Sequence, residues 1–170
     1  SNSTALTRAC APGWPSTFKV GVVMLQFGVR KPGIDYRHRT VAFGVAERDG
    51  LIACVRVERP SGPYFDLPGG GLDLEETEVE ALRREFLEET GLTIAPLNRI
   101  AEAGQYFVRS TDEPVNNVGG FWTARVAAED PAAKCEDDHT LVWLDPTVAL
   151  SRLRHDSHAW AVAVWLRRPS

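Results

Sequence analysis

Three glutamates near the middle of the chain, Glu85, Glu88 and Glu89, are spaced so that together they could bind a divalent metal. They belong to residues 76–90, a segment without Pro or Gly that is rich in strong helix formers and therefore predicts a helix. Because a helix turns about 100° per residue, spacings of three and four gather these carboxylates within an arc of roughly 100°. Like charges this close repel, and Mg²⁺ or Mn²⁺, which prefer oxygen ligands, would remove the conflict. A solvated acidic helix face is the alternative interpretation.

Three consecutive glycines, Gly69, Gly70 and Gly71, precede this helix. Since glycine has no Cβ, the backbone here can approach a ligand closely, with carbonyl groups facing a metal and N–H groups facing phosphate. Pro68 restricts Leu67 to an extended conformation, so the glycine loop is entered from a strand. The glycines alone would indicate only a loop, but next to the glutamates they favour a metal and phosphate site.

The combined pattern resembles the complete signature of the Nudix hydrolases, Gly-x5-Glu-x7-Arg-Glu-U-x-Glu-Glu-x-Gly-U, where U is a bulky aliphatic or aromatic residue. Gly70, Glu76 and residues 84–92 match all nine specified positions over 23 residues. The resemblance implies an α/β fold, namely a Nudix-like α/β/α sandwich with a mixed β-sheet and a loop–helix–loop catalytic motif. It also implies a Mg²⁺- or Mn²⁺-dependent pyrophosphohydrolase that cleaves a nucleoside diphosphate linked to another moiety (NDP-X) by attack of water on phosphorus.

The resemblance further implies roles for particular residues. Glu85 and Glu89 would be the main metal ligands, and the carbonyl of Gly69 would be a backbone ligand. Glu88 would be a third ligand or would support a second metal. Arg84 would orient the glutamates through an ion pair, and Glu76 would organise the same network. The general base is either Glu85 or a carboxylate from the acidic loop at 136–138, for which simple solvation is the competing interpretation.

Substrate contacts are harder to assign from the sequence. Besides Gly70 and Gly71, we expect Arg56 to reach a phosphate and Tyr106 to stack on a base, although a surface ion pair and core packing are their respective alternatives. The basic run at 37–39 could bind phosphate, but an exposed hairpin tip is the favoured interpretation. A catalytically silent Nudix-fold domain that only senses a nucleotide stays open as an alternative function, and the identity of X is not indicated.

The elements that must position these residues follow from the pattern along the chain. Strands are expected at 18–27, 40–47, 51–58, 93–109, 118–127 and 140–144, and an Asp-Gly pair at 49–50 predicts a hairpin. In the central helix, Val79, Leu82 and Phe86 form the apolar stripe and Gly91 ends the helix. A short helix capped by Asp145 should be followed by a last helix that Asp156 or Ser157 caps and that runs through Arg168. The chain should comprise an irregular arm at 1–17 and a single domain at 18–170.

Composition narrows the class of protein. The 170 residues are 44% hydrophobic with a net charge of −4, which fits a folded domain and argues against binding of duplex nucleic acid. The three cysteines are widely spaced, so a disulfide framework or zinc site is not expected. No stretch has the length of a membrane span or the order of a signal peptide. We therefore expect a cytoplasmic protein without a membrane partner, and the resemblance implies a small nucleotide diphosphate substrate. The tryptophans are expected to be core residues or contacts of a possible homodimer.

Overall fold

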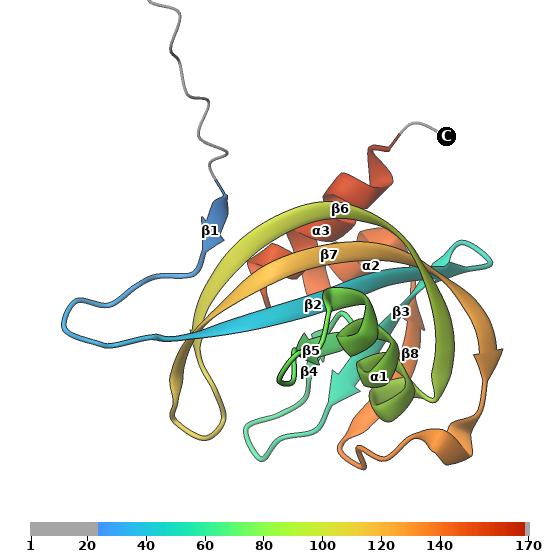
Figure 1. Cartoon of the computed structure of the whole chain (residues 1–170), viewed down its shortest axis with the longest axis horizontal. Helices are drawn as coiled ribbons and strands as arrows, with labels where there is room; N and C mark the ends of the chain where they lie inside the picture. The colour runs from blue at the N-terminus through green and yellow to red at the C-terminus, as the bar shows by residue number, and fades with distance from the viewer. Residues whose placement is uncertain (1–23, 169–170) are drawn as a thin grey trace, which may run out of the picture.

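The computed structural model describes residues 24–168 and contains an eight-stranded mixed sheet with helices on both faces (Figure 1). The expected arm at 1–17 and most of the expected strand at 18–27 lie outside the described residues. The elements in chain order are β1 (Leu25–Phe27), β2 (Arg37–Arg48), β3 (Leu51–Val57), β4 (Tyr64–Asp66), β5 (Gly69–Gly71), α1 (Glu78–Thr90), β6 (Leu92–Val108), β7 (Pro114–Glu129), the 3-10 helix η1 (Pro131–Ala133), β8 (His139–Leu144), α2 (Pro146–Arg152) and α3 (Asp156–Leu166).

The sheet combines parallel and antiparallel pairs, as the sequence predicted. Its strand order is β1-β6-β7-β2-β3-β4, with β5 paired to β2 and β8 paired to β3. β2 runs parallel to β7 and β1 runs parallel to β6, whereas the other pairs are antiparallel. The predicted β2–β3 hairpin is confirmed: Asp49 and Gly50 have φ angles of 54° and 79°, the left-handed conformation that a tight hairpin turn requires.

Alternation along the central strand β2 gives the two faces of the sheet different cores. Val41, Phe43 and Val45 point to the face covered by α2 and α3, while the smaller Ala42 and Ala46 point toward α1. The small side chains let α1 lie close to the sheet: a Cβ at Gly44 would be 2.7 Å from the ring of Phe86. The two cores produce the expected α/β/α sandwich.

Side-chain capping sets the start of α1 later than expected. Thr77 caps the helix by accepting the N–H of Glu80, whose carboxylate in turn accepts the N–H of Thr77. The helix therefore begins at Glu78, and Glu76 lies in the preceding loop. Gly91 ends the helix with a φ of 74°, as predicted.

The two C-terminal helices differ in how they begin. The side chain of Asp145 caps α2 as predicted, accepting the N–H of Thr147 at 2.8 Å. For α3 the predicted cap is wrong, because the cap position is His155, which makes no side-chain capping bond. Gln105 from β6 replaces the missing cap, since its side-chain oxygen accepts the N–H of Ser157 at 3.2 Å. Within residues 24–168, no helix is long and apolar enough to cross a membrane.

Candidate active site

The two glutamates expected to be the main metal ligands are buried at the inner edge of α1. Glu85 and Glu89 are 8% and 6% exposed, whereas Glu88 is partly exposed. Burial raises the pKa of Glu85, as do the charges of Glu136 and Glu88, although Arg84 opposes the shift. Burial also raises the pKa of Glu89 well above its ordinary value. The fold thus holds these carboxylates where negative charge is unfavourable without a compensating cation.

Each of the three glycines lies against a different group that a Cβ atom would contact too closely. Gly69 has a φ of 135°, and a Cβ there would lie 2.7 Å from the backbone of Phe43. A Cβ at Gly70 would lie 2.5 Å from a carboxylate oxygen of Glu85. A Cβ at Gly71 would lie 2.6 Å from the guanidinium of Arg39. The run therefore lets one acidic and one basic side chain lie directly against the backbone of β5.

The backbone contact between β5 and α1 involves an N–H group. The N–H of Gly69 donates to Oε2 of Glu89 at 2.9 Å, which fixes one oxygen of this carboxylate. The predicted ligand role of the Gly69 carbonyl stays a prediction.

Arg84 connects most of the acidic residues of the motif. Its guanidinium donates to both oxygens of Glu76 at 2.9 and 2.8 Å and to the carbonyl of Gly71 at 3.0 Å. It also donates to Glu85 at 3.0 Å and to Glu88 at 3.2 Å. Hydrogen bonding to Arg84 lowers the pKa of Glu76 to about 2, so this carboxylate is ionised at neutral pH. The geometry suits the orienting role expected for Arg84 and Glu76.

The loop at 134–138 brings a further carboxylate to α1. The N–H groups of Cys135 and Glu136 donate to the carbonyl of Glu88 at 3.0 and 3.2 Å. These bonds anchor the loop to the last turn of the helix, where carbonyl groups lack partners within the helix. Glu136 consequently faces the buried glutamates, while Asp137 is exposed. The solvation interpretation therefore fits Asp137 and does not fit Glu136.

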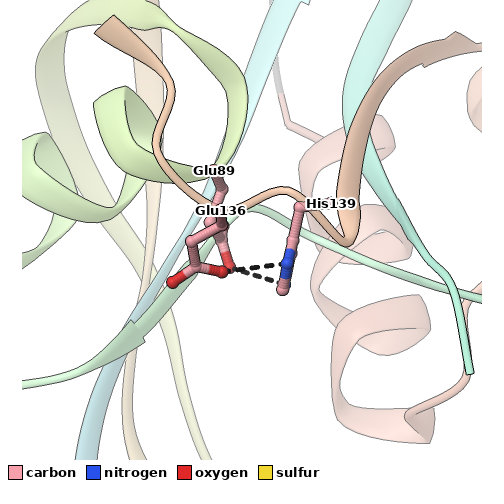
Figure 2. Close-up of side chains that lie close together, drawn as sticks. All are labelled: Glu89, Glu136 and His139. Atoms are coloured by element: carbon pink, nitrogen blue, oxygen red, sulfur yellow. Dashed lines mark ion pairs between the residues drawn. The ribbon is translucent and has the colours of Figure 1, made fainter.

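His139, at the start of β8, joins this loop to α1 and was missed by the sequence analysis. Figure 2 shows its ring beside Glu89 and Glu136: Nε2 lies 3.5 Å from Glu89, and Nδ1 lies 2.9 Å from Glu136. Nδ1 also lies 2.8 Å from Asp138. Burial lowers the pKa of His139, but Glu136 and Asp138 outweigh burial, so the pKa is raised overall.

The donor set fits a divalent cation. Ligand atoms of Glu85, Glu88 and Glu136 lie within 4.8 Å of one another, and so do those of Glu89, Glu136 and His139. Carboxylate oxygens are the ligands that Mg²⁺ and Mn²⁺ prefer. Burial raises the pKa of Glu85 and Glu89 more than Arg84 and the Gly69 N–H lower it, so a cation bound there would stabilise their charged forms. Glu136 is the one residue that belongs to both of these groups.

A cleft of about 420 Å³ opens beside the glutamates. Its walls carry four arginines, namely Arg39, Arg59, Arg109 and Arg154. Three of them are paired with acids: Arg59 with Asp138, Arg109 with Glu113, and Arg154 with Asp66.

Arg39 differs from the other three arginines. Among residues 24–168 no carboxylate lies within 4.0 Å of its guanidinium, and burial followed by the nearby charge of Arg109 lowers its pKa. The cleft thus combines acidic groups at one side with a half-buried, unpaired cation, an arrangement suited to a metal-bound phosphate.

Two predicted substrate contacts are placed elsewhere by the register of the sheet. Neighbouring residues of a strand point to opposite faces, so Arg56 points away from the face to which Val55 and Val57 point. The residues paired with these two valines on the adjacent strands line the cleft, namely Asp66, Tyr64 and His139. Arg56 therefore points to the opposite face, where it pairs with Glu58.

Tyr106 is likewise absent from the cleft. Its ring packs edge-on against Tyr36 with centroids 5.0 Å apart, and the adjacent Phe107 lines the cleft instead. The hairpin-tip interpretation of 37–39 is wrong, because all three residues lie in β2 and pair with β7. Arg39 lines the cleft, whereas Arg37 and His38 are exposed. The basic run was the one signal in the sequence that could have identified Arg39.

Comparison with known proteins gives consistent matches. The profile of the NUDIX domain matches residues 36–166. The chain is 36% identical over 99 residues to an RNA pyrophosphohydrolase of Erythrobacter litoralis (strain HTCC2594), covering 56% of this chain and 58% of that protein. It is 27% identical over 126 residues to an 8-oxo-(d)GTP phosphatase of Mycolicibacterium smegmatis (strain ATCC 700084 / mc(2)155), covering 74% of this chain and 37% of that protein. The matched part thus spans less than two thirds of either relative.

Solved structures with the same fold include two with modest sequence identity. A NUDIX hydrolase from Nitrosomonas europaea superposes with a TM-score of 0.65 at 18% identity, covering 76% of this chain and 89% of the other. A MutT protein from Methanosarcina mazei Go1 superposes with a TM-score of 0.60 at 19% identity, covering 79% and 96%. At these identities the likeness establishes the fold.

Proposed function

The chain belongs to the NUDIX domain family. From that premise we propose that it is a Nudix hydrolase, namely a Mg²⁺- or Mn²⁺-dependent pyrophosphohydrolase acting on NDP-X compounds. The observation that carries this proposal is the group of buried or half-buried carboxylates on α1 and the 134–138 loop, which faces an arginine-lined cleft. We further propose that residues 18–170 act as one catalytic domain.

The acidic residues would hold the metal. Glu85, Glu88, Glu89 and Glu136 would supply its ligands, and a bound divalent ion there would neutralise charge on phosphate oxygens and make its bound water more acidic. Arg84 keeps the carboxylates of Glu85 and Glu88 in position, and its bidentate pair with Glu76 fixes the guanidinium itself.

A carboxylate at the cleft accepts the proton of the attacking water. Glu85 is the candidate within the motif, and it lines the cleft. Glu136 is the alternative from the loop, and hydrogen bonding to His139 lowers its pKa. The pH dependence of kcat/KM distinguishes the two candidates. If Glu136 is the base, Glu136→Gln should abolish the decrease of kcat/KM at low pH, and Glu85→Gln should keep it. If Glu85 is the base, Glu85→Gln should abolish this decrease and Glu136→Gln should keep it.

The arginines on the cleft wall would bind the phosphate groups. Arg39 has no acidic partner among the described residues, so an anionic substrate would supply one. Arg109 lies near it and contributes to its lowered pKa. Two guanidiniums that repel one another in the free protein would be stabilised by a phosphate bound between them.

A panel of substrates tests the proposal. It should include NDP-sugars, dinucleoside polyphosphates and, because of the names of the two relatives, 8-oxo-dGTP and RNA with a phosphorylated end. We expect release of phosphate, pyrophosphate or a nucleoside monophosphate that requires Mg²⁺ or Mn²⁺ and falls by about 10²-fold or more in Glu85→Gln.

Glu129→Gln is a matched control, because Glu129 is an exposed residue that pairs with Arg48 away from the cleft. It should retain the activity of the parent protein. Tight nucleotide binding without turnover of any panel member would contradict the proposed hydrolysis and indicate a silent, nucleotide-sensing Nudix domain.

A further inference from the structure

One carboxylate oxygen of the buried Glu89 has no hydrogen-bond donor in the protein. Its Oε2 accepts the N–H of Gly69 at 2.9 Å. No donor among residues 24–168 forms a hydrogen bond with Oε1, from which Nε2 of His139 lies 3.5 Å away. Glu89 is only 6% exposed, but it lines the cleft, so a small ligand that enters the cleft can reach this carboxylate.

The separation of Oε1 and Nε2 fits two ligands of one metal ion better than it fits a hydrogen bond. Hydrogen bonds between such atoms are about 2.7–3.2 Å long. Two neighbouring ligands that each lie roughly 2.1 Å from a divalent ion are about 3–4 Å apart. Ligand atoms of Glu89, Glu136 and His139 all lie within 4.8 Å of one another, so one ion could contact all three side chains.

The other ring nitrogen of His139 is held by carboxylates of its own loop. Nδ1 lies 2.8 Å from Oδ1 of Asp138 and 2.9 Å from Oε2 of Glu136, and Arg59 pairs with Asp138 in turn. Because carboxylates accept hydrogen bonds, the neutral ring carries its proton on Nδ1 and has its lone pair on Nε2. Histidines that bind metals usually donate their other N–H to a carboxylate in this way, which fixes the orientation of the ring.

We propose that Glu89, Glu136 and His139 bind one divalent transition-metal ion, with Nε2 of His139 as a nitrogen ligand (Figure 2). This inference rests on the proposed function, which places a divalent metal beside Glu89. Glu136 and His139 lie outside residues 70–92, so the signature segment does not contain the nitrogen ligand. Mg²⁺ is a hard cation that takes oxygen ligands, whereas imidazole suits transition-metal ions. Mn²⁺ should therefore bind at this position in preference to Mg²⁺.

The competing interpretation is that His139 serves only as a protonated cation among the acids. Glu136 and Asp138 raise its pKa in the protein without metal. A protonated ring would direct the N–H of Nε2 at Glu89, but 3.5 Å exceeds the roughly 2.7–2.9 Å of a charge-assisted hydrogen bond. A metal ion and this proton compete for the same lone pair, so direct detection of a metal–nitrogen bond distinguishes the two roles.

Electron spin-echo spectroscopy of bound Mn²⁺ tests the nitrogen ligand without any substrate. The parent protein with an equimolar amount of Mn²⁺ should show the echo modulation of a directly coordinated imidazole nitrogen. His139→Gln should abolish this modulation. His38→Gln is the matched control and should retain it, because His38 is an exposed histidine of β2 that does not line the cleft.

Two spectroscopic results would overturn the inference. One is the absence of nitrogen modulation in the parent protein, which would leave His139 only the role of a cation beside the carboxylates. The other is modulation that persists in His139→Gln, which would assign the nitrogen to another residue. The spectrum of the parent protein needs no variant, so it decides the question even if a substitution prevents folding.

Calorimetric titrations with Mn²⁺ and Mg²⁺ measure the metal preference. His139→Gln should weaken Mn²⁺ binding by about tenfold or more and Mg²⁺ binding by less than about threefold, because Mg²⁺ gains little from a nitrogen ligand. Asp138→Asn should also weaken Mn²⁺ binding by about tenfold, since Asp138 orients the ring through Nδ1. Equal losses of Mn²⁺ and Mg²⁺ affinity in His139→Gln would contradict the nitrogen ligand.

Hydrolysis assays on the same preparations separate this inference from the proposed function. Nitrogen coordination of Mn²⁺ without hydrolysis of any substrate of the panel would support the metal site and refute the proposed hydrolysis. Metal-dependent hydrolysis by a protein whose bound Mn²⁺ shows no nitrogen coordination would support the hydrolase and refute the metal site.

Discussion

Replacing Gly70 with alanine should lower the proposed hydrolase activity strongly and leave the fold intact. A Cβ at this position would lie 2.5 Å from Oε1 and 2.7 Å from Cδ of Glu85. To reach ordinary van der Waals contact at 3.4 Å, the carboxylate must retreat by about 0.9 Å. Arg84 holds the same carboxylate at 3.0 Å, so the retreat displaces a proposed metal ligand from a restrained position.

A displacement of this size has a large effect on rate and a small effect on stability. Catalytic groups must be held within roughly 0.5 Å, and a misplacement of about 1 Å can lower a rate by about 10²-fold, so we expect kcat/KM to fall roughly 100-fold. Gly70 does not have a positive φ, and alanine reduces the entropy of the unfolded chain by about 0.4–1 kcal/mol. Because the clash is with the end of a side chain, Tm should change by no more than about 4 °C.

Product release from the best substrate of the panel, measured with the thermal unfolding of the same preparations, tests this reasoning. Gly69→Ala is the contrasting variant, because its Cβ would lie 2.7 Å from the Cα of Phe43 at a φ of 135°, and it should lower Tm strongly. In a Glu85→Gln background, Gly70→Ala should cause little further loss, since the affected ligand is already compromised. Activity near that of the parent, or the same 100-fold loss in both backgrounds, would refute the reasoning.

Three further predictions follow from burial and charge. Burial raises the pKa of Glu89 in the folded protein above its ordinary value of 4.5. The charged carboxylate therefore destabilises the metal-free fold, and this cost grows as the pH rises from 4.5 through the folded-state pKa. Glu89→Gln keeps an oxygen that accepts the N–H of Gly69. This variant should therefore have a higher Tm than the parent protein at pH 8 in EDTA, and the same Tm near pH 4.5. An equal Tm difference at both pH values would contradict this prediction. Arg39→Ala should raise KM about tenfold or more by removing a charge-assisted phosphate contact, whereas Arg56→Ala, on the opposite face of the sheet, should leave KM unchanged. Phe86→Ala should cost about 3–5 kcal/mol of unfolding free energy in a denaturant titration, since this ring is completely buried under α1, and a cost below about 1 kcal/mol would argue against that packing.

The sequence by itself determined the features that depend on neighbours along the chain. The period of the helix places Glu85 and Glu89 on one side of α1, and the left-handed preference of Gly91 ends that helix. The turn at Asp49 and Gly50 is equally local. All of these features depend on only a few adjacent residues. The reaction class came from the resemblance of residues 70–92 to the Nudix signature, which is likewise a local pattern.

Only the tertiary structure decided which distant side chains reach the cleft. A shift of one residue in strand register reverses the face to which a side chain points, and register is fixed by pairing with strands far away in the chain. For this reason the sequence misplaced Arg56 and selected Tyr106 where Phe107 lines the cleft.

The additional charged and polar groups of the site were hidden for the same physical reason. Glu136 reaches the glutamates because its loop bonds to the carbonyl of Glu88, and His139 reaches them from β8. Local spacing therefore defined the carboxylates of the helix, while long-range packing assembled the cleft that would recognise the substrate.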